Sequence, residues 1–378
     1  MGIEQILANP NIEIFEIPIH SPEWYDFRFS GIGASEIGYV LRKSDWKDSL
    51  PVYEEKVGLK QIGFMRNEQM VMGSYMEQHI ADMWQYHEPG GEDYWQNITA
   101  GKKFRSCITE PIKHKYFRNK KFPHLFCSLD GLIPTGSLTS SGDVLNYPGV
   151  LEIKNQRSFV LEKWILKIPP EQLYQIHQIM LILESSYGEI ATLVDGCHLR
   201  ITPVPLVPEL AEDLLTESYK FWHQNVLPAK GLKKQIEEAY FNHNTQRAAE
   251  LEAELFDYEP PPIGRRGYLE YLSENAKIEP SEIVTNSKVY DSAMTMKNID
   301  LIKKELDLFK SQEEAFIRHH FRVKDGNIMD FGEFGTIRLK KREGSDKASL
   351  YNYVKDSVSK QEHITAAKQQ VEQLQFKY

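Results

Sequence analysis

The sequence predicts a mixed α/β fold followed by a helical, hairpin-bearing extension, and three observations support this. Residues 1–228 alternate short apolar runs of strand length with longer amphipathic runs of helical length. Residues 287–322 carry apolar side chains at helical spacing, at Ile299, Ile302, Leu306 and Phe309. After them, residues 328–331 and 334–339 flank Gly332-Glu333, which is the pattern of a β-hairpin.

The domain organisation follows from length and from the prolines. At 378 residues the chain is longer than one typical domain requires. We expect a first domain over residues 1–228, ending near Leu227-Pro228. We expect a helical connector and a stiff proline-rich linker over 229–262, because residues 232–256 favour helix and a run of prolines follows. An extension of unassigned role covers 263–378 and closes with a helix rich in Gln and Lys.

Composition excludes several classes of protein. Hydrophobic residues make up 41% and charged residues 26%, which is ordinary for a globular protein and argues against wholesale disorder. The longest aliphatic run, Ile179–Leu183, is far too short to span a bilayer, and the amino terminus has no basic, apolar leader. We therefore expect a cytoplasmic protein without membrane contact. The three cysteines lack short paired spacings, which excludes a disulfide framework and a four-cysteine metal site.

Charge is unevenly distributed along the chain. The net charge of −9 counts against a protein that coats nucleic acid nonspecifically. Between Lys102 and Lys121, however, one acid, Glu110, stands among eight basic residues: Lys102, Lys103, Arg105, Lys113, Lys115, Arg118, Lys120 and Lys121. Such a stretch could follow a phosphate backbone, or it could be a solvated lysine-rich loop.

Two apolar strands carry the residues that point to chemistry. Within residues 150–154, Glu152 and Lys154 lie two positions apart and so project from one face of a strand. A buried strand normally rejects two charges. The preceding apolar strand, residues 124–133, carries Asp130, and the intervening Gly- and Ser-containing loop can return the chain antiparallel to it.

If these strands pair, Asp130 and Glu152 can share a divalent metal that prefers hard oxygen ligands. We expect Mg²⁺, with Mn²⁺ as a substitute. Lys154 could then orient or deprotonate the attacking water and neutralise charge on a phosphate, which is the chemistry of phosphodiester hydrolysis. The alternative is an edge strand with a cross-face ion pair. The triplet alone is not specific, since Glu54-Glu55-Lys56 repeats it.

Two helices add candidate residues. In residues 70–87, Glu77 shares a face with apolar neighbours and is either a further metal-directed carboxylate or a boundary residue that reaches water. In residues 172–186, Gln175 could hold the catalytic water or the lysine by hydrogen bonds. We expect His177, on the same helix, to have a structural role rather than to bind metal.

Six stretches, taken together and in this order, are more specific than any one motif. The chain resembles the PD-(D/E)xK nuclease superfamily, and specifically the YqaJ-like viral recombinases related to phage lambda exonuclease. The resemblance covers about residues 20–228, and the matching stretches are Trp24-Tyr25-Asp26-Phe27-Arg28, Gly31-Ile32-Gly33-Ala34-Ser35-Glu36-Ile37, Gly73-Ser74-Tyr75-Met76-Glu77, Ser128-Leu129-Asp130-Gly131-Leu132, Leu151-Glu152-Ile153-Lys154 and Gln175-Ile176-His177. Leu129 and His177 depart from the family pattern, which usually has a proline and a second glutamine there.

The resemblance implies a restriction-endonuclease-like central mixed sheet flanked by helices. It implies a metal held by Glu77, Asp130, Glu152 and the carbonyl of Ile153, with Lys154 and Gln175 completing the catalytic set. It also implies a pocket for a 5′-phosphate, because arginine offers a bidentate fork and hydroxyls complete the cradle. The residues of that pocket are Arg28, Ser35 and Ser128.

The expected function is a magnesium-dependent exonuclease that degrades linear duplex DNA from the 5′ end, for phage-type recombination in a bacterial or phage-infected cell. Expected partners are DNA ends, a single-strand annealing protein and further copies of the chain. Two alternatives stay open, an endonuclease on the same fold and an inactive DNA-end-binding scaffold. Cutting of closed circular DNA distinguishes the first, and binding without cleavage distinguishes the second.

Overall fold

The structure is a computed structural model in which two units are described separately. The chain divides into Met1–Lys277 and Ile278–Tyr378. No helix among the described residues is long and apolar enough to cross a membrane. The residues described are 3–44, 48–60, 68–91, 94–161, 168–261, 272–273, 287–323, 328–330, 335–341 and 348–354.

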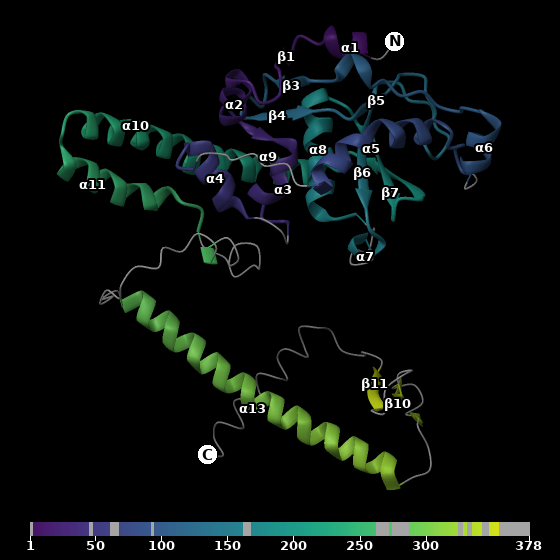
Figure 1. Ribbon diagram of the computed structural model, residues 1–378, viewed down its shortest axis with the longest axis vertical. Helices are drawn as coiled ribbons and strands as arrows, with labels where there is room; N and C mark the ends of the chain where they lie inside the picture. The colour runs from purple at the N-terminus through teal and green to yellow at the C-terminus, as the bar shows by residue number, and fades with distance from the viewer. Residues whose placement is uncertain are drawn as a thin grey trace. The chain divides into compact units, whose positions relative to one another are not determined.

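The first unit contains two mixed four-stranded sheets (Figure 1). The first sheet has the order β1 (Ile12–Glu16), β3 (Lys115–Asn119), β4 (Leu125–Ser128), β2 (Ile32–Gly33), with β2 parallel to β4 and the other pairs antiparallel. The second has the order β5 (Gly131–Ile133), β6 (Gly149–Gln156), β7 (Tyr187–Val194), β8 (His198–Pro205), with β6 and β7 parallel. The predicted α/β class, mixed sheets flanked by helices, is confirmed.

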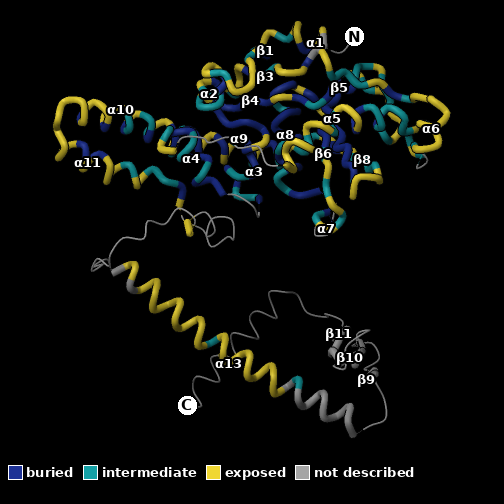
Figure 2. The backbone as a smooth tube through the Cα atoms, viewed as in Figure 1, coloured by how far each residue is buried: buried dark blue, intermediate teal, exposed yellow. Residues whose placement is uncertain are grey.

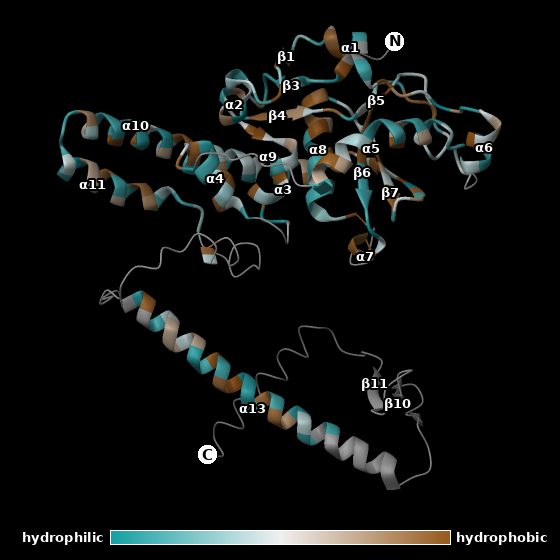
Figure 3. Cartoon of the chain, viewed as in Figure 1, coloured by the Kyte–Doolittle hydropathy of each residue, from teal (hydrophilic) through white to brown (hydrophobic). Residues whose placement is uncertain are grey.

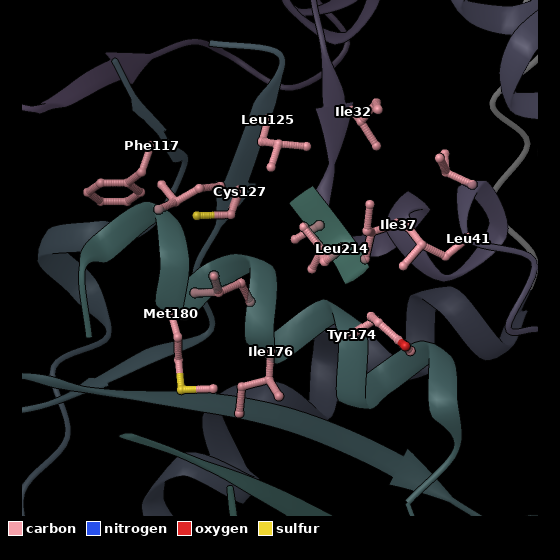
Figure 4. Close-up of a cluster of buried hydrophobic side chains, with 14 of the residues drawn as sticks. Ile32, Ile37, Leu41, Phe117, Leu125, Cys127, Tyr174, Ile176, Met180 and Leu214 are labelled. Carbon is pink, nitrogen blue, oxygen red and sulfur yellow. The ribbon is translucent and has the colours of Figure 1, made fainter. Parts of the chain in front are cut away.

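Helix α8 (Pro170–Leu183) lies between the sheets and contributes several residues to the main buried cluster. It contacts β3 and β4 of the first sheet and β6 and β7 of the second. Figure 4 shows Ile176 and Met180 of α8 in one cluster with Phe117 and Leu125 of the first sheet, and all four side chains are buried. Burial on both sides explains why the second half of this helix, Ile179–Leu183, is apolar all round. Figure 2 shows the same interior as a continuous buried zone.

Helix α5 (Glu68–Gln85) covers β6 and β7. Ile80 and Trp84 are fully buried on its inner face, where they pack against Leu151 and Leu193. Glu77 lies one turn before Ile80 on that face. The remaining helical elements of this unit are α1 (Ile3–Leu7), α2 (Pro22–Phe29), η1 (Ala34–Glu36), α3 (Ile37–Val40), α4 (Ser49–Val57), α6 (Tyr94–Ala100), η2 (Glu110–Ile112), α7 (Ser158–Leu161), α9 (Pro208–Lys220), the π-helical turn η3 (Phe221–Val226), α10 (Leu227–Phe241), α11 (Thr245–Leu255) and η4 (Phe256–Tyr258).

The residues 232–256, which the sequence predicts as helical, form two helices, α10 and α11, that pack as a hairpin (Figure 1). The chain reverses at His243, whose φ is 56°, and the Asn244 side chain caps α11 by accepting a hydrogen bond from the Arg247 N–H. Folding back buries Leu232 and Ile236 against Leu251. A straight helix would leave this apolar stripe in water.

The predicted strand over 124–133 is divided in two. β4 belongs to the first sheet and β5 to the second, and the chain changes sheets at Leu129-Asp130. The break places Asp130 outside the ladder of either sheet. The predicted helices over 70–87 and 172–186 are confirmed as α5 and α8, although α8 ends at Leu183 because Glu184 adopts a left-handed conformation with φ 55°.

The second unit contains α13 (Ser287–Val323) and a sheet of order β11 (Ala348–Val354), β10 (Gly335–Lys341), β9 (Ile328–Asp330). The predicted helix and hairpin are confirmed, with Thr336 opposite Asp330 and a further strand added. Figure 3 shows apolar and polar residues alternating along α13. The predicted terminal helix, and Pro262 at the end of the predicted linker, lie outside the described residues.

Candidate active site

Asp130 occupies the junction between the two sheets. Gly131 pairs with Leu151 in the antiparallel β5–β6 ladder, so extending this register by one position places Asp130 opposite Glu152. The Oδ2 atom of Asp130 accepts a hydrogen bond of 2.9 Å from the Ile153 N–H. The next residue, Gly131, packs closely against its neighbours, because a Cβ atom there would lie 2.7 Å from the Cys107 Sγ and 3.3 Å from the Leu151 side chain. The predicted pairing of the two acid-bearing strands is therefore confirmed.

Glu152 and Lys154 project from the same face of β6, as the spacing predicts. The Lys154 Nζ donates a hydrogen bond to Glu152 Oε1. The Gln175 Nε2 of α8 donates to the same oxygen at 2.6 Å. The Glu152 side chain is 2% exposed and that of Lys154 is 21% exposed, so of this pair only the lysine side chain reaches solvent appreciably. Two donors from different elements fix one carboxylate oxygen of Glu152.

Burial and mutual repulsion disfavour the charged forms of the Asp130 and Glu152 carboxylates. Burial, with the neighbouring Asp130 carboxylate second, raises the pKa of Glu152 to about 7. Burial also raises the pKa of Asp130, against the opposing influence of Lys154 and the Ile153 N–H. Burial acts to lower the pKa of Lys154, but the Glu152 and Asp130 carboxylates outweigh it and raise that pKa. Crowded carboxylates of this kind are stabilised by a further cation.

Glu77 approaches the same region from α5. Its carboxylate raises the pKa of Glu152, after the larger influences of burial and Asp130, which places its charge within electrostatic reach. Glu77 and Asp130 line one cavity of about 100 Å³. The other residues that line it are Ser74, Gln78, Thr109, Glu110, Lys113 and Leu129.

The donor set fits a magnesium ion. Asp130, Glu152 and Glu77 supply hard oxygen atoms, and Mg²⁺ commonly uses one or two carboxylates while keeping several waters. Among the residues that the structure describes, no three His, Cys, Asp or Glu side chains form a ready-made metal cluster. The hydrogen bonds described above occupy one oxygen of each carboxylate, so the second oxygen of Asp130 and of Glu152 could ligate a metal ion.

Arg28 lies apart from these carboxylates, at the end of α2. Its guanidinium contacts Glu36, and Glu55 at 3.2 Å, while its side chain is 16% exposed. The Arg28 Nε is buried and has no hydrogen-bond partner among the described residues. Ser35 and Ser128 are exposed; Ser35 lies two residues after β2, and Ser128 is the last residue of the parallel strand β4. Because Gly33 pairs with Phe126, both serines lie at the same end of these strands, and Ser35 is next to the Arg28 partner Glu36.

Comparison with known proteins identifies this region. The family model of the YqaJ-like viral recombinase domain matches residues 23–186. This part of the chain is a YqaJ-like viral recombinase domain. It contains the whole span from Arg28 to Gln175, and thus every site residue that the sequence suggests. None of the curated proteins matches the chain.

Solved structures similar to this chain include an alkaline exonuclease from Laribacter hongkongensis. It is 16% identical, with a TM-score of 0.36, and the match covers 61% of this chain and 100% of that one. The same enzyme in complex with dAMP is 19% identical, with the same TM-score and coverage.

Sequence reasoning missed the ionic cluster that surrounds Arg28 in the YqaJ-like domain. Lys56 of α4 is fully buried, and its Nζ lies 2.7 Å from Glu36 Oε2 and donates to the Arg28 carbonyl at 2.9 Å. Burial acts to raise the pKa of Glu36, but Lys56 and Arg28 outweigh it and lower that pKa. The signal was Lys56 beside Tyr53 and Val57 on an otherwise buried helical face.

Sequence reasoning also missed how polar side chains hold the domain's elements together. The Gln178 Nε2 donates to the carbonyls of Ile32 and Phe126, and so joins β2 to β4. His177 is structural, as expected, because its Nε2 accepts from the Val207 N–H at 3.1 Å and its Nδ1 contacts the Leu173 carbonyl. Glu189, a single acid inside the buried strand β7, was the available sign of a buried ion pair.

Proposed function

We propose that this chain is a magnesium-dependent DNA nuclease, an exonuclease that digests linear duplex DNA from the 5′ end. The observation that carries the proposal is the arrangement of Asp130, Glu152 and Lys154 on paired strands, with Gln175 fixing Glu152, inside a YqaJ-like domain. A binding scaffold has no need for two buried, mutually repelling carboxylates beside a lysine.

Asp130, Glu152, Glu77 and the Ile153 carbonyl would hold the metal. When bound, the ion acidifies a coordinated water and polarises the phosphate oxygens. The Lys154 ammonium stabilises the negative charge that develops on the phosphate as water attacks. Gln175 keeps the Glu152 carboxylate in one orientation through its 2.6 Å hydrogen bond. The water oxygen bonds to phosphorus and the bond from phosphorus to the 3′ oxygen breaks, which leaves a new 5′-phosphate on the shortened strand.

The 5′ polarity rests on Arg28, Ser35 and Ser128. The buried Arg28 Nε has no protein partner among the described residues, so a phosphate oxygen can accept a hydrogen bond from it. Glu55, 20% exposed and 3.2 Å from Arg28, is the carboxylate that a terminal phosphate would displace. Each cleavage creates the 5′-phosphate that this pocket binds next. DNA ends, a single-strand annealing protein and further copies of the chain are the proposed partners, in the cytoplasm of a bacterial or phage-infected cell.

The test incubates the protein with linear and covalently closed circular duplex DNA, first with Mg²⁺ and then with EDTA. The proposal predicts loss of the linear form alone, and only with Mg²⁺. Cutting of the circle would replace the exonuclease with an endonuclease. Binding of linear DNA without any cleavage would overturn the enzyme and leave the scaffold.

A further inference from the structure

The basic stretch Lys102–Lys121 is not a continuous surface for DNA. Arg105 is fully buried and paired with Glu189 at 2.8 Å. Lys103 contacts Asp82, Lys121 contacts Glu184, and the Arg118 guanidinium lies over the Phe27 ring. Four of the eight basic residues therefore contact different parts of the domain.

One member of the stretch is placed differently. Lys113 lines the cavity of about 100 Å³ that Glu77 and Asp130 also line. Its side chain is 58% exposed, so Lys113 both lines the cavity and reaches solvent. Its protein partner is Glu110, 72% exposed, at 3.6 Å, which is a weak and solvent-screened pair. Lys113 is therefore a cation beside the proposed metal ligands with little holding it to the protein.

Local structure fixes where Lys113 stands. The 3-10 turn Glu110–Ile112 precedes it, and the Lys113 N–H donates to the Glu110 carbonyl at 3.3 Å. His114 follows with φ 62°, a conformation uncommon outside glycine and asparagine. β3 then begins at Lys115 and pairs on both sides. Because a sharp turn and a central strand flank it, the Lys113 backbone is held at the cavity rather than on a long loop.

We propose that Lys113 contacts a backbone phosphate of a DNA strand that passes over this cavity, and so positions the strand beside Asp130 and Glu77. This inference rests on the proposed function. The charge arrangement supports it: the Glu77, Glu110 and Asp130 carboxylates line the cavity and repel a DNA phosphate, so a cation beside them lowers that repulsion. Lys113 supplies that cation, and the Thr109 and Ser74 hydroxyls lining the same cavity are available to phosphate oxygens. DNA replaces Glu110 as the partner of Lys113.

Lys113 is a positioning residue, so its test includes binding as well as turnover. Lys120 is the matched control, since it belongs to the same basic stretch, is exposed, and donates only to the Pro10 carbonyl at 2.8 Å among the partners described. Lys113→Ala is expected to lower kcat/KM on linear duplex about tenfold, which corresponds to the loss of one phosphate contact. The slope of log binding constant against log salt should fall by about 1. Lys113→Arg should retain most of the activity, and Lys120→Ala should match the wild type.

Glu110→Gln is a second variant, and unlike Lys113→Ala it should not weaken duplex binding. It removes the carboxylate that competes with phosphate for Lys113, so duplex binding should be equal to or tighter than in the wild type. Binding of the same duplex is measured with EDTA, where no cleavage occurs, and the affinity for Mn²⁺ is measured without DNA. Lys113→Ala should weaken duplex binding and leave the affinity for Mn²⁺ unchanged.

The outcomes separate this proposal from the proposed function. If Lys113→Ala and Lys120→Ala behave alike in binding, salt slope and kcat/KM, Lys113 has no contact with DNA and the inference is overturned. If the wild type binds DNA but never cleaves it, the nuclease proposal fails. The difference between the two lysine variants in the EDTA binding experiment still decides the place of Lys113.

Discussion

Replacing Glu189 with alanine should severely destabilise the YqaJ-like domain. The Glu189 side chain is fully buried and is held by four groups: Arg105 Nη1 at 2.8 Å, Trp84 Nε1 at 2.8 Å, the Ser140 N–H at 2.7 Å and the Tyr187 hydroxyl at 2.7 Å. The alanine variant leaves a buried guanidinium without its counter-ion. Breaking a buried pair in this way costs about 3–5 kcal/mol. That is a large share of a total folding free energy of about 5–15 kcal/mol.

The assay is urea unfolding, with the free energy of unfolding taken from the midpoint and slope. Lys103→Ala is the control, because the Lys103–Asp82 pair is exposed and should contribute less than about 1 kcal/mol. Arg105→Met combined with Glu189→Leu removes both charges and should recover part of the loss. A Glu189→Ala variant no less stable than Lys103→Ala would refute the reasoning.

The consequence extends to the candidate active site through α5. Trp84, which donates to Glu189, and Glu77 are seven residues apart and so lie on the same face of α5, about 10 Å along its axis. The buried pair therefore fixes the helix that presents Glu77.

Three further predictions follow from single contacts. Lys154→Ala should lower kcat by about 10²–10³-fold, with metal affinity retained, because the ammonium acts on water and phosphate; equal single-turnover rates would make Lys154 structural. Arg28→Ala should erase a preference for 5′-phosphorylated over 5′-hydroxyl duplex of roughly tenfold to hundredfold, from a charge-assisted contact of about 1.5–3 kcal/mol; equal initial rates of the wild type on both substrates would remove the pocket. The Lys121 ammonium is the main cause, and the Asn9 amide the second, that lowers the pKa of Glu184 from 4.5 to about 2. This carboxylate therefore stabilises the fold above pH 4.5, and the stabilisation is lost as pH falls toward 2. Glu184→Gln should lose less stability over that window in urea unfolding at stepped pH, and superimposable profiles would contradict it.

The contacts that sequence predicted are those set by strand periodicity and short range. Glu152 and Lys154 share a face because their spacing is two, and the loop before Gly149 returns β6 beside Gly131. These two constraints are enough to bring Asp130 next to Glu152. The sequence also suggested that the Gln175 amide could form hydrogen bonds in the site, and in the structure it donates to Glu152.

Other features depend on partners distant in sequence, which periodicity does not encode. Arg28 meets Glu55 and Lys56 through the packing of α2 on α4. The helical run over 232–256 folds back at His243, which lets Leu232 pack against Leu251, although each half alone has good helix propensity. The change of sheet at Asp130 likewise depends on strand pairing, because β4 pairs with β2 and β3 whereas β5 pairs with β6.

The most direct test of the central claim compares cleavage and binding in Glu152→Gln and Asp130→Asn. Each substitution keeps the shape of the side chain and removes one charge that would hold the metal. With linear 5′-phosphorylated duplex and Mg²⁺, neither variant should give detectable product. Duplex binding should stay measurable, and the far-ultraviolet circular dichroism spectrum should match that of the wild type. Wild-type turnover by either folded variant would contradict the assignment of Asp130 and Glu152 as the centre of a metal-dependent nuclease.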